Sequence, residues 1–274
     1  MIPSASAVEH APLDLAHALT VARAAADAAA QVIGKYWRSG VAVSHKSDAS
    51  PVTAADVESE LAIKQVLKAS FPEHGYFGEE TPGEHLDAEY LWLIDPIDGT
   101  KSFVRNYPMF STQIALMHRG ALLLGVSQAS EFGETAWAYR GGGAWLNGKR
   151  IFCANTSELN AAILSTGNIK TLSRGPRWQV LAELLQGANR TRGYGDFYHY
   201  HLLAKGSIDL VIESDLNILD IAALAVIVRE AGGVCTDLEG AELNLQTGSM
   251  LAGTPAMHAL GLQAMRVTAP VVSS

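Results

Sequence analysis

The stretch LWLIDPIDGTKSF (residues 91–103) places two carboxylates, Asp95 and Asp98, where an apolar run stops. We expect LWLID to form a short buried strand and Pro96 to fix a turn after it. The two carboxylates would then converge on one point beyond the end of the strand. Like charges so close repel unless a cation lies between them or one group is protonated, so the stretch favours a metal site.

The next two residues strengthen this hypothesis. Gly99 would let a ligand approach the backbone, and the N–H groups of Gly99 and Thr100 would open a helix, where phosphate binds well. Carboxylates for Mg²⁺ beside amides for phosphate are typical of a metal-assisted phosphatase. The structural alternative is that Asp98 only caps this helix.

Three further acids fit the same picture, and each has a structural alternative. Asp56 lies in the first turn of a helix predicted over residues 53–71, where it could be only the acid of a capping box with Thr53. Glu79, in FGEE, could be one of a solvated acidic pair. Asp220 stands just before an apolar helix and could be its N-cap.

The pattern around these acids predicts helices first and an antiparallel meander second. Apolar residues at helical spacing predict helices over residues 13–38 and 53–71. Residues 111–130 predict a hairpin whose turn is HRGA, and TAWAYR (residues 135–140) continues the sheet. A glycine-rich turn and another strand are expected over residues 141–151. This order is typical of an α+β or layered arrangement.

Beyond residue 153 the pattern alternates between strands and helices. The predicted strands are AILSTG, TRGYG and IDLVIES, and the predicted helices are RWQVLAELLQGA, FYHYHLLAKG and LDIAALAVIVREAGG. Such alternation predicts an α/β lobe. We therefore expect an N-terminal α+β lobe over residues 1–152 and a C-terminal α/β lobe over residues 153–274, with a cleft between them.

Composition excludes several classes of partner. A chain of 274 residues with 48% hydrophobic content can bury a full core, and its net charge of −8 gives no reason to expect nucleic acid or an anionic membrane. Cys153 and Cys235 have no metal-type spacing and suit a reducing compartment. No signal peptide and no membrane-spanning apolar run is predicted, so we expect a cytoplasmic protein.

The motifs together resemble the Mg²⁺-dependent, lithium-sensitive inositol monophosphatase superfamily. The resemblance rests on GEE (78–80), DPIDGTKSF (95–103) and LDIAAL with EAGG (219–233), and it extends over residues 13–262. It implies a layered αβαβα sandwich, of the inositol monophosphatase and fructose-1,6-bisphosphatase type, and a homodimer. Leu219 departs from the family pattern, because many members have tryptophan there.

The resemblance also assigns roles to residues. It implies that two or three Mg²⁺ ions are bound by Glu79, Asp95, the carbonyl of Ile97, Asp98 and Asp220. Asp56, in VTAAD, would pair with Thr100 to orient the attacking water, with Glu79 also contributing to catalysis, and the amides of Gly99 and Thr100 would hold the phosphate. No covalent nucleophile is required. Dependence on Mg²⁺ and inhibition by Li⁺ or Ca²⁺ are expected.

The substrate is expected to be a small phosphate monoester. By alignment to the family, Gly195, Asp196 and Glu213 face the leaving alcohol, and two carboxylates there favour an ammonium group by charge-assisted hydrogen bonding. L-Histidinol phosphate has that ammonium, and the chain resembles the histidinol-phosphatase branch in DGTKSF and in the glycine and aspartate before LLAKG. That branch has Lys-Pro-Tyr before the last aspartate, whereas this chain has Asn217, Ile218 and Leu219.

Several alternatives stay open. Asp196 could only cap the helix FYHYHLLAKG, Glu213 could pair with a surface lysine or arginine, and the histidines at 199 and 201 are expected to be solvated or packed rather than metal ligands. Inositol 1-phosphate is the alternative substrate, with bisphosphate substrates less favoured. A metal- and phosphate-binding protein that does not hydrolyse is the alternative of another class.

Overall fold

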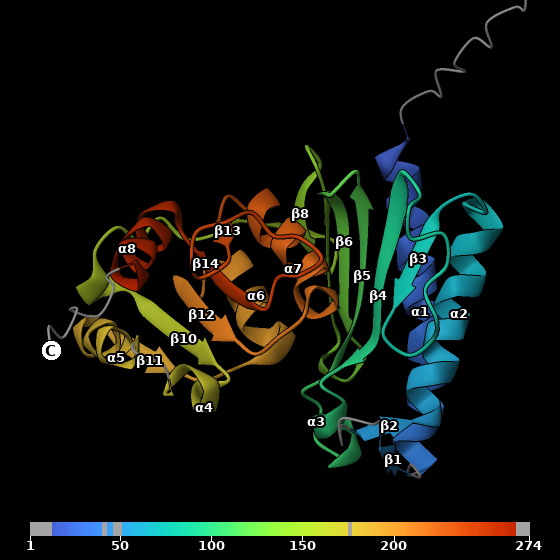
Figure 1. The fold of residues 1–274 in the computed structure, drawn as a ribbon, viewed down its shortest axis with the longest axis horizontal. Coiled ribbons are helices and arrows are strands. Elements are labelled where there is room, and N and C mark those ends of the chain that lie inside the picture. The colour runs from blue at the N-terminus through green and yellow to red at the C-terminus, as the bar shows by residue number, and fades with distance from the viewer. Residues whose placement is uncertain (1–12, 40–42, 46–50, 175–176, 267–274) are drawn as a thin grey trace, which may run out of the picture.

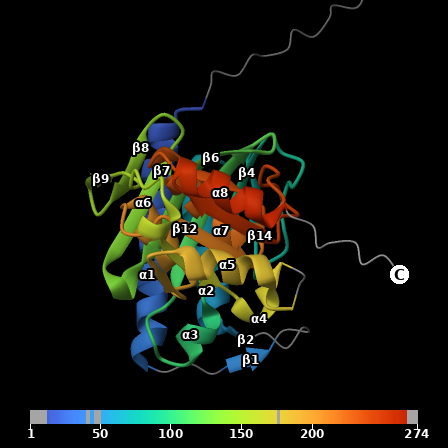
Figure 2. The same ribbon diagram turned by 90° about the vertical axis from the view of Figure 1, so that its left-hand side faces the viewer.

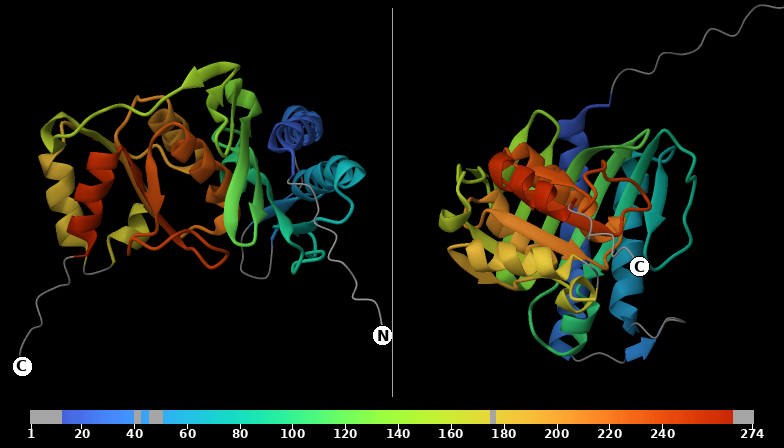
Figure 3. Two further views of the ribbon diagram at one scale, coloured as in Figure 1. Left: turned by 90° about the horizontal axis from the view of Figure 1, so that it is seen from above. Right: turned by 60° about the vertical axis from the view of Figure 1, so that its left-hand side comes forward.

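The computed structural model describes residues 13–39, 43–45, 51–174 and 177–266. The secondary structure lies in five layers, helices alternating with two sheets (Figure 1). The same layering is visible from above in Figure 3. The predicted layered αβαβα arrangement is thus confirmed.

The first layer consists of α1 (Leu15–Ser39) and α2 (Ala54–Ser70), so both predicted helices are confirmed. Asp14 caps α1, because its Oδ1 accepts hydrogen bonds from the N–H groups of Ala16 and His17 at 3.0 and 3.1 Å. The buried face of α1 is built largely of alanines, which lets it pack closely on α2 and the sheet. Between the helices, β1 (Val43–His45) pairs antiparallel with β2 (Pro51–Thr53). The side chain of Thr53 lies outside the described part, so the capping box remains a prediction.

The second layer is a seven-stranded sheet in which sequence neighbours pair side by side. Its strands are antiparallel except for the parallel pair β3 and β4. The predicted hairpin is confirmed, but the stretch 141–151 forms two strands where one was expected, because Asn147 and Gly148 make a tight turn with positive φ. The strands are β3 (Gly75–Gly78), β4 (Tyr90–Asp98), β5 (Ser111–His118), β6 (Ala121–Ala129), β7 (Glu134–Tyr139), β8 (Gly143–Leu146) and β9 (Lys149–Ile151).

Strand β4 corrects the prediction of a short strand that ends in a turn. It continues to Asp98 through a bulge: Asp95 pairs with Gln113 and Asp98 with Ser111, so β4 advances three residues while β5 advances two. Residues three apart on a regular strand point to opposite faces, and the one extra residue brings Asp95 and Asp98 to the same side. Pro96 fits the bulge because it has no N–H to donate to the ladder.

The third layer, α6 (Asp196–Ala204) and α7 (Ile218–Glu230), lies between the two sheets (Figure 1). Helix α7 is buried almost all round, which explains its continuous apolar sequence. One core cluster joins this layer to both sheets. The division at residues 152 and 153 separates the strands of the two sheets, but this shared core crosses it, and the division into lobes stays a prediction.

The second sheet has the order β11-β10-β12-β14-β13, with parallel pairing on one side of β12 and antiparallel pairing on the other. Its outer face is covered by α5 and α8, which lie in front of it in Figure 2. The strands are β10 (Ile163–Gly167), β11 (Arg190–Arg192), β12 (Leu210–Ser214), β13 (Val234–Thr236) and β14 (Ser249–Gly253). The remaining helices are α3 (Thr100–Val104), α4 (Ile169–Leu172), α5 (Trp178–Gly187) and α8 (Pro255–Met265), with 3₁₀ turns at Ser130–Phe132 and Leu159–Ala161. None of the helices in the described ranges is long and apolar enough to cross a membrane.

Candidate active site

Three carboxylates from distant parts of the chain meet between the first sheet and the central helices. Glu79 directly follows β3, Asp95 lies at the bulge of β4, and Asp220 lies in the first turn of α7. One oxygen atom from each carboxylate lies within 4.8 Å of those of the other two. The structure therefore brings together three of the residues predicted as metal ligands.

Burial and repulsion from neighbouring carboxylates oppose ionisation of Asp95 and Asp220. Asp95 is only 2% exposed, and burial together with the charges of Glu79, Asp98 and Asp220 raises its pKa well above the usual value. Burial also raises the pKa of Asp220 to about 7, with Glu79 and Glu213 adding repulsion. A divalent cation between the carboxylates would replace the proton and relieve this repulsion.

Asp98 lies beside the same cluster. Burial raises its pKa, and the charges of Asp196 and Asp220 raise it further. The N-cap of α3 is Gly99, so the alternative in which Asp98 caps that helix is wrong. The N-cap of α7 is Asn217, so Asp220 is not the N-cap either; it is the third helical residue, and its Oδ2 accepts the Asn217 N–H at 2.8 Å in a capping box.

Gly99 and Thr100 lie at the turn between the bulge and α3. The backbone of Gly99 has a φ of 91°, and a Cβ at this position would lie 2.5 Å from the carbonyl oxygen of Met109, so both conformation and space require glycine. The Thr100 hydroxyl lies 3.2 Å from Oδ1 of the buried Asp56 and 3.0 Å from the carbonyl oxygen of Ile97. A hydroxyl has one proton, so it can donate to only one of these two acceptors at a time.

A cleft of about 340 Å³ opens beside these residues. Its walls combine the ends of β4 and α3 with α6, β12 and the start of α7. Six carboxylates line it, those of Glu79, Asp98, Asp196, Glu213, Asp215 and Asp220, together with one basic side chain, that of Lys101. The cleft is therefore strongly negative. Asp56, Asp95, Ile97 and Gly195 are not part of the lining that the described residues form.

Asp196, the first residue of α6, and Glu213, on β12, both line the cleft. Burial raises the pKa of Asp196 to about 6, and the charge of Glu213 adds to the shift. The N-cap of α6 is Gly195, so Asp196 does not cap that helix as the alternative supposed. The structure thus leaves both carboxylates facing the cleft.

Glu213 is held by two residues whose role the sequence did not reveal. It is 5% exposed, and its Oε2 lies 3.0 Å from Nε2 of His199 and accepts the Tyr200 hydroxyl at 2.8 Å. The alternative in which Glu213 pairs with a surface lysine or arginine is therefore wrong. Both predicted histidines are packed, since His199 and His201 are fully buried. The spacing i, i+3, i+4 of Asp196, His199 and Tyr200 on α6 was a usable signal, because such residues share a helix face.

Comparison with known proteins identifies relatives over most of the chain. The family model described as the inositol monophosphatase family matches residues 14–268. The histidinol-phosphatase of Chlorobaculum parvum is 34% identical over 222 residues, covering 81% of this chain and 86% of that protein. The Nus factor SuhB of Salmonella typhimurium is 33% identical over 255 residues, covering 90% and 95%. The structure of the inositol monophosphatase from Anabaena superposes with a TM-score of 0.82 at 28% identity, covering 94% of this chain and 99% of that one.

Proposed function

This chain belongs to the inositol monophosphatase family, and we propose that it hydrolyses L-histidinol phosphate in a Mg²⁺-dependent reaction. The family and its phosphatase-named relatives make the chain a phosphomonoesterase hydrolase that acts on small phosphate monoesters. The metal, the residue roles and the individual substrate are the proposed part.

The observation that carries the proposal is the charge of the cleft. A phosphate monoester is an anion, and six carboxylates against one lysine would repel it. Cations held by these carboxylates would offset the repulsion and let the cleft accept phosphate. Burial and repulsion from neighbouring carboxylates also raise the pKa values of Asp98, in the cleft, and of Asp95, beside it, and bound cations would favour the ionised forms of both.

The chemistry of the donor atoms fits Mg²⁺. Glu79, Asp95 and Asp220 offer hard carboxylate oxygens that lie close together, and Asp98 borders the same space. Mg²⁺ prefers such oxygens, whereas softer metals prefer histidine and cysteine. We propose that these four side chains and the carbonyl of Ile97 hold two or three Mg²⁺ ions. When bound, Mg²⁺ would neutralise phosphate charge and lower the pKa of a coordinated water.

The remaining steps belong to residues of the chain. In the proposed reaction the Thr100 hydroxyl accepts a hydrogen bond from the attacking water. The same hydroxyl donates a hydrogen bond to Oδ1 of Asp56, which lies 3.2 Å from the hydroxyl oxygen. The backbone amides of Gly99 and Thr100, at the turn into α3, would hold the phosphate. Water adds to phosphorus as the ester P–O bond breaks, and the proton that the water loses is taken up by the departing oxygen, so that the product leaves as the alcohol.

Two carboxylates support a cationic substrate. Asp196 and Glu213 both line the cleft, and repulsion between them contributes to the raised pKa of Asp196. We propose that they contact the leaving alcohol, as the family resemblance implies. An ammonium group between them would remove this repulsion and form charge-assisted hydrogen bonds. L-Histidinol phosphate carries that group, and a relative is named histidinol-phosphatase. Inositol 1-phosphate is the alternative substrate, supported by the likeness to the inositol monophosphatase structure.

The test compares phosphate release from L-histidinol phosphate and D-myo-inositol 1-phosphate, each with Mg²⁺ and with EDTA. The proposal predicts Mg²⁺-dependent release with a strong preference for the histidinol ester. Preference for the inositol ester would overturn the substrate and leave the metal-dependent reaction standing. Absence of release from either ester would favour another phosphomonoester or a relative that binds without hydrolysis. We also propose that Li⁺ inhibits the reaction, which the same phosphate-release assay tests, and that the protein is a homodimer, which light scattering tests.

A further inference from the structure

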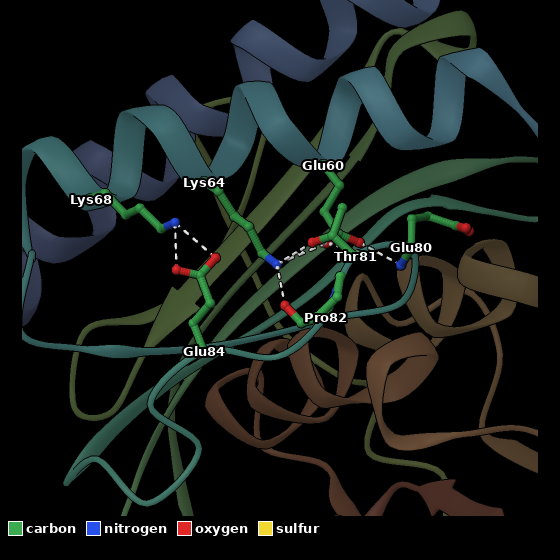
Figure 4. Close-up of polar contacts among 7 residues, drawn as sticks. All are labelled: Glu60, Lys64, Lys68, Glu80, Thr81, Pro82 and Glu84. Atoms are coloured by element: carbon green, nitrogen blue, oxygen red, sulfur yellow. Dashed lines mark hydrogen bonds and ion pairs between the residues drawn. The ribbon is translucent and has the colours of Figure 1, made fainter.

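One face of helix α2 contacts two of the three segments that carry the proposed metal ligands. Asp56, Glu60, Lys64 and Lys68 repeat every four residues and therefore share this face. Asp56 approaches Thr100 beside the β4 bulge, and the other three reach the segment after β3 that begins with Glu79. Figure 4 shows Glu60, Lys64 and Lys68 pointing from α2 toward that segment.

Glu60 is a fully buried carboxylate whose acceptor capacity is used by this segment. Its Oε2 accepts the Glu80 N–H at 2.7 Å, and its Oε1 accepts the Thr81 N–H at 3.1 Å. The Thr81 hydroxyl also donates to Oε1. Hydrogen bonds from N–H groups to a carboxylate are stronger than neutral ones, and burial makes their loss expensive.

Lys64 supplies the balancing charge. Its ammonium nitrogen lies 3.0 Å from Oε1 of Glu60, and both side chains are buried. The same ammonium donates to the Thr81 hydroxyl and lies 3.5 Å from the carbonyl oxygen of Pro82. A buried ion pair adds little net stability, but it fixes one arrangement, because any other leaves a buried charge unpaired.

Glu60 acts on both sides of Glu79. On the side toward β3, a Cβ at Gly78 would lie 2.1 Å from Oε1 of Glu60, so the carboxylate packs directly against the Gly78 backbone. On the other side, Glu60 binds the Glu80 N–H. The residue that carries the proposed metal ligand therefore lies between two backbone positions that Glu60 fixes.

We propose that Glu60, paired with Lys64, is a positioning residue that sets the affinity of the site for Mg²⁺ by holding the backbone around Glu79. The inference rests on the proposed function, because it assumes that Glu79 is a metal ligand. Glu60 itself touches neither metal nor substrate. Glu60 instead holds Glu79 in place, because Glu79 begins an exposed segment and could otherwise move with it.

The chain offers a matched control one turn further along α2. Lys68 forms an ion pair with Glu84 at 2.7 Å, which also joins α2 to the segment after β3 (Figure 4). This pair is 40% and 41% exposed, and it lies five residues beyond Glu79. An effect of general tethering would appear in both pairs, whereas an effect of positioning would appear only in the first.

The experiment measures the Mg²⁺ dissociation constant of the full chain by isothermal titration calorimetry, beside the melting temperature. Glu60→Gln keeps the size of the side chain but presents an NH₂ group where one backbone N–H needs an acceptor. We expect it to weaken Mg²⁺ binding by about 10-fold or more, the usual effect of removing a residue that orients a metal ligand. Glu84→Gln should change the constant by less than about twofold, because an exposed pair contributes little.

A second pair of variants keeps the test decisive if Glu60→Gln does not fold. Thr81→Val removes the hydroxyl that donates to Glu60 and accepts from Lys64, and it should weaken Mg²⁺ binding by about threefold or more, because two hydrogen bonds that fix the Glu60 carboxylate are lost. Thr81→Ser keeps that hydroxyl and should restore the affinity of the unmodified protein. Excess Mg²⁺ should restore turnover in Thr81→Val, which a misfolded protein would not allow.

The outcomes separate this inference from the function on which it rests. Wild-type affinity for Mg²⁺ in folded Glu60→Gln, or in Thr81→Val where Glu60→Gln does not fold, would overturn the inference and leave the function intact. Equal weakening by Glu60→Gln and Glu84→Gln would also overturn it, in favour of general tethering. Absence of Mg²⁺ binding by the unmodified protein would overturn the proposed function, and the inference with it.

Discussion

The acids of the candidate metal cluster and the half-buried Glu134 differ in what balances their charge. In the cluster that Glu79 completes, Asp95 and Asp220 have raised pKa values because burial and neighbouring carboxylates both oppose ionisation. At the start of β7, Glu134 lies 3.1 Å from Nδ1 of His201 and accepts a hydrogen bond from Lys205, and these two contacts lower its pKa to about 2. The charge of Glu134 is balanced by hydrogen-bond donors of the protein, whereas the carboxylates around Asp95 repel one another.

The two kinds of acid should therefore have opposite effects on the stability of the metal-free protein. Donors such as His201 and Lys205 make ionised Glu134 stabilising, so its removal should cost stability and leave the cleft unaffected. The acids around Asp95 should destabilise the metal-free protein, and their removal should cost function.

The largest effect is expected from Asp95→Asn. This change should reduce kcat/KM by at least about 1000-fold, since the electrostatic contribution of a catalytic metal is several kcal/mol and about 4 kcal/mol corresponds to that factor. Initial rates of phosphate release at several Mg²⁺ concentrations would measure it. Activity within tenfold of the unmodified protein would remove Asp95 from the proposed site.

A smaller effect is expected from Thr100→Ala. Its hydroxyl can hydrogen-bond to Asp56, and removing this proposed water-orienting contact should lower kcat by about 100-fold at saturating Mg²⁺, as expected for loss of proton-transfer assistance. The Mg²⁺ dissociation constant should stay unchanged, because no carboxylate is removed. Unchanged turnover at saturating Mg²⁺ would contradict the proposed pairing with Asp56.

Glu213 tests whether a satisfied acid can also select substrate. Although His199 and Tyr200 hold one of its oxygens, Glu213 still lines the cleft. Glu213→Gln should lower the preference for L-histidinol phosphate over D-myo-inositol 1-phosphate by about 10-fold, the effect of one charge-assisted hydrogen bond. Ratios of kcat/KM for the two esters measure it. A ratio that does not change would mean that the carboxylate plays no part in selection.

The smallest effect is expected from Glu134→Gln, and it should appear in stability alone. At pH 7 the free energy of unfolding should fall by about 1 to 2 kcal/mol, the contribution of hydrogen bonds to a charged group. Because the pKa of Glu134 is lowered from 4.5 to about 2, its stabilisation is present above pH 4.5 and is lost as the pH falls toward 2. Urea unfolding at pH 7 and pH 3 should therefore show the difference between the two proteins shrinking. A difference that grows on acidification, or a change in Mg²⁺ affinity, would contradict the contrast.

Much of the fold follows from local sequence patterns. The helical spacing over residues 13–38 and 53–71 and the turn HRGA each identify an element whose bounds the structure nearly reproduces. These features depend on neighbours in sequence, which a pattern can represent. The bulge that brings Asp95 and Asp98 to the same side cannot be recognised from neighbours in sequence, because it is defined by the register of β4 against β5. The predicted turn at Pro96 was wrong for that reason.

The candidate site also has features that the sequence predicts and features that only the fold reveals. Each predicted acid could be recognised within its own motif, but the convergence of Glu79 and Asp220 depends on packing between distant elements. The partners of the acids were missed because each partner lies on a helix that also serves the core. Glu60 on α2 and His199 on α6 both stand at helical spacing from a predicted site residue, and attention to that spacing would have identified them.

The most direct test of the account is a comparison of melting temperatures for the unmodified protein and Asp95→Asn, each in EDTA and in Mg²⁺. We expect Mg²⁺ to raise the melting temperature of the unmodified protein, because a ligand that binds only the folded state stabilises it. Asp95→Asn should melt at a higher temperature than the unmodified protein in EDTA, since it removes a buried repelling charge, and it should lose the response to Mg²⁺. An unmodified protein that does not respond to Mg²⁺, or a variant that responds equally, would contradict the claim that this cluster is a metal site.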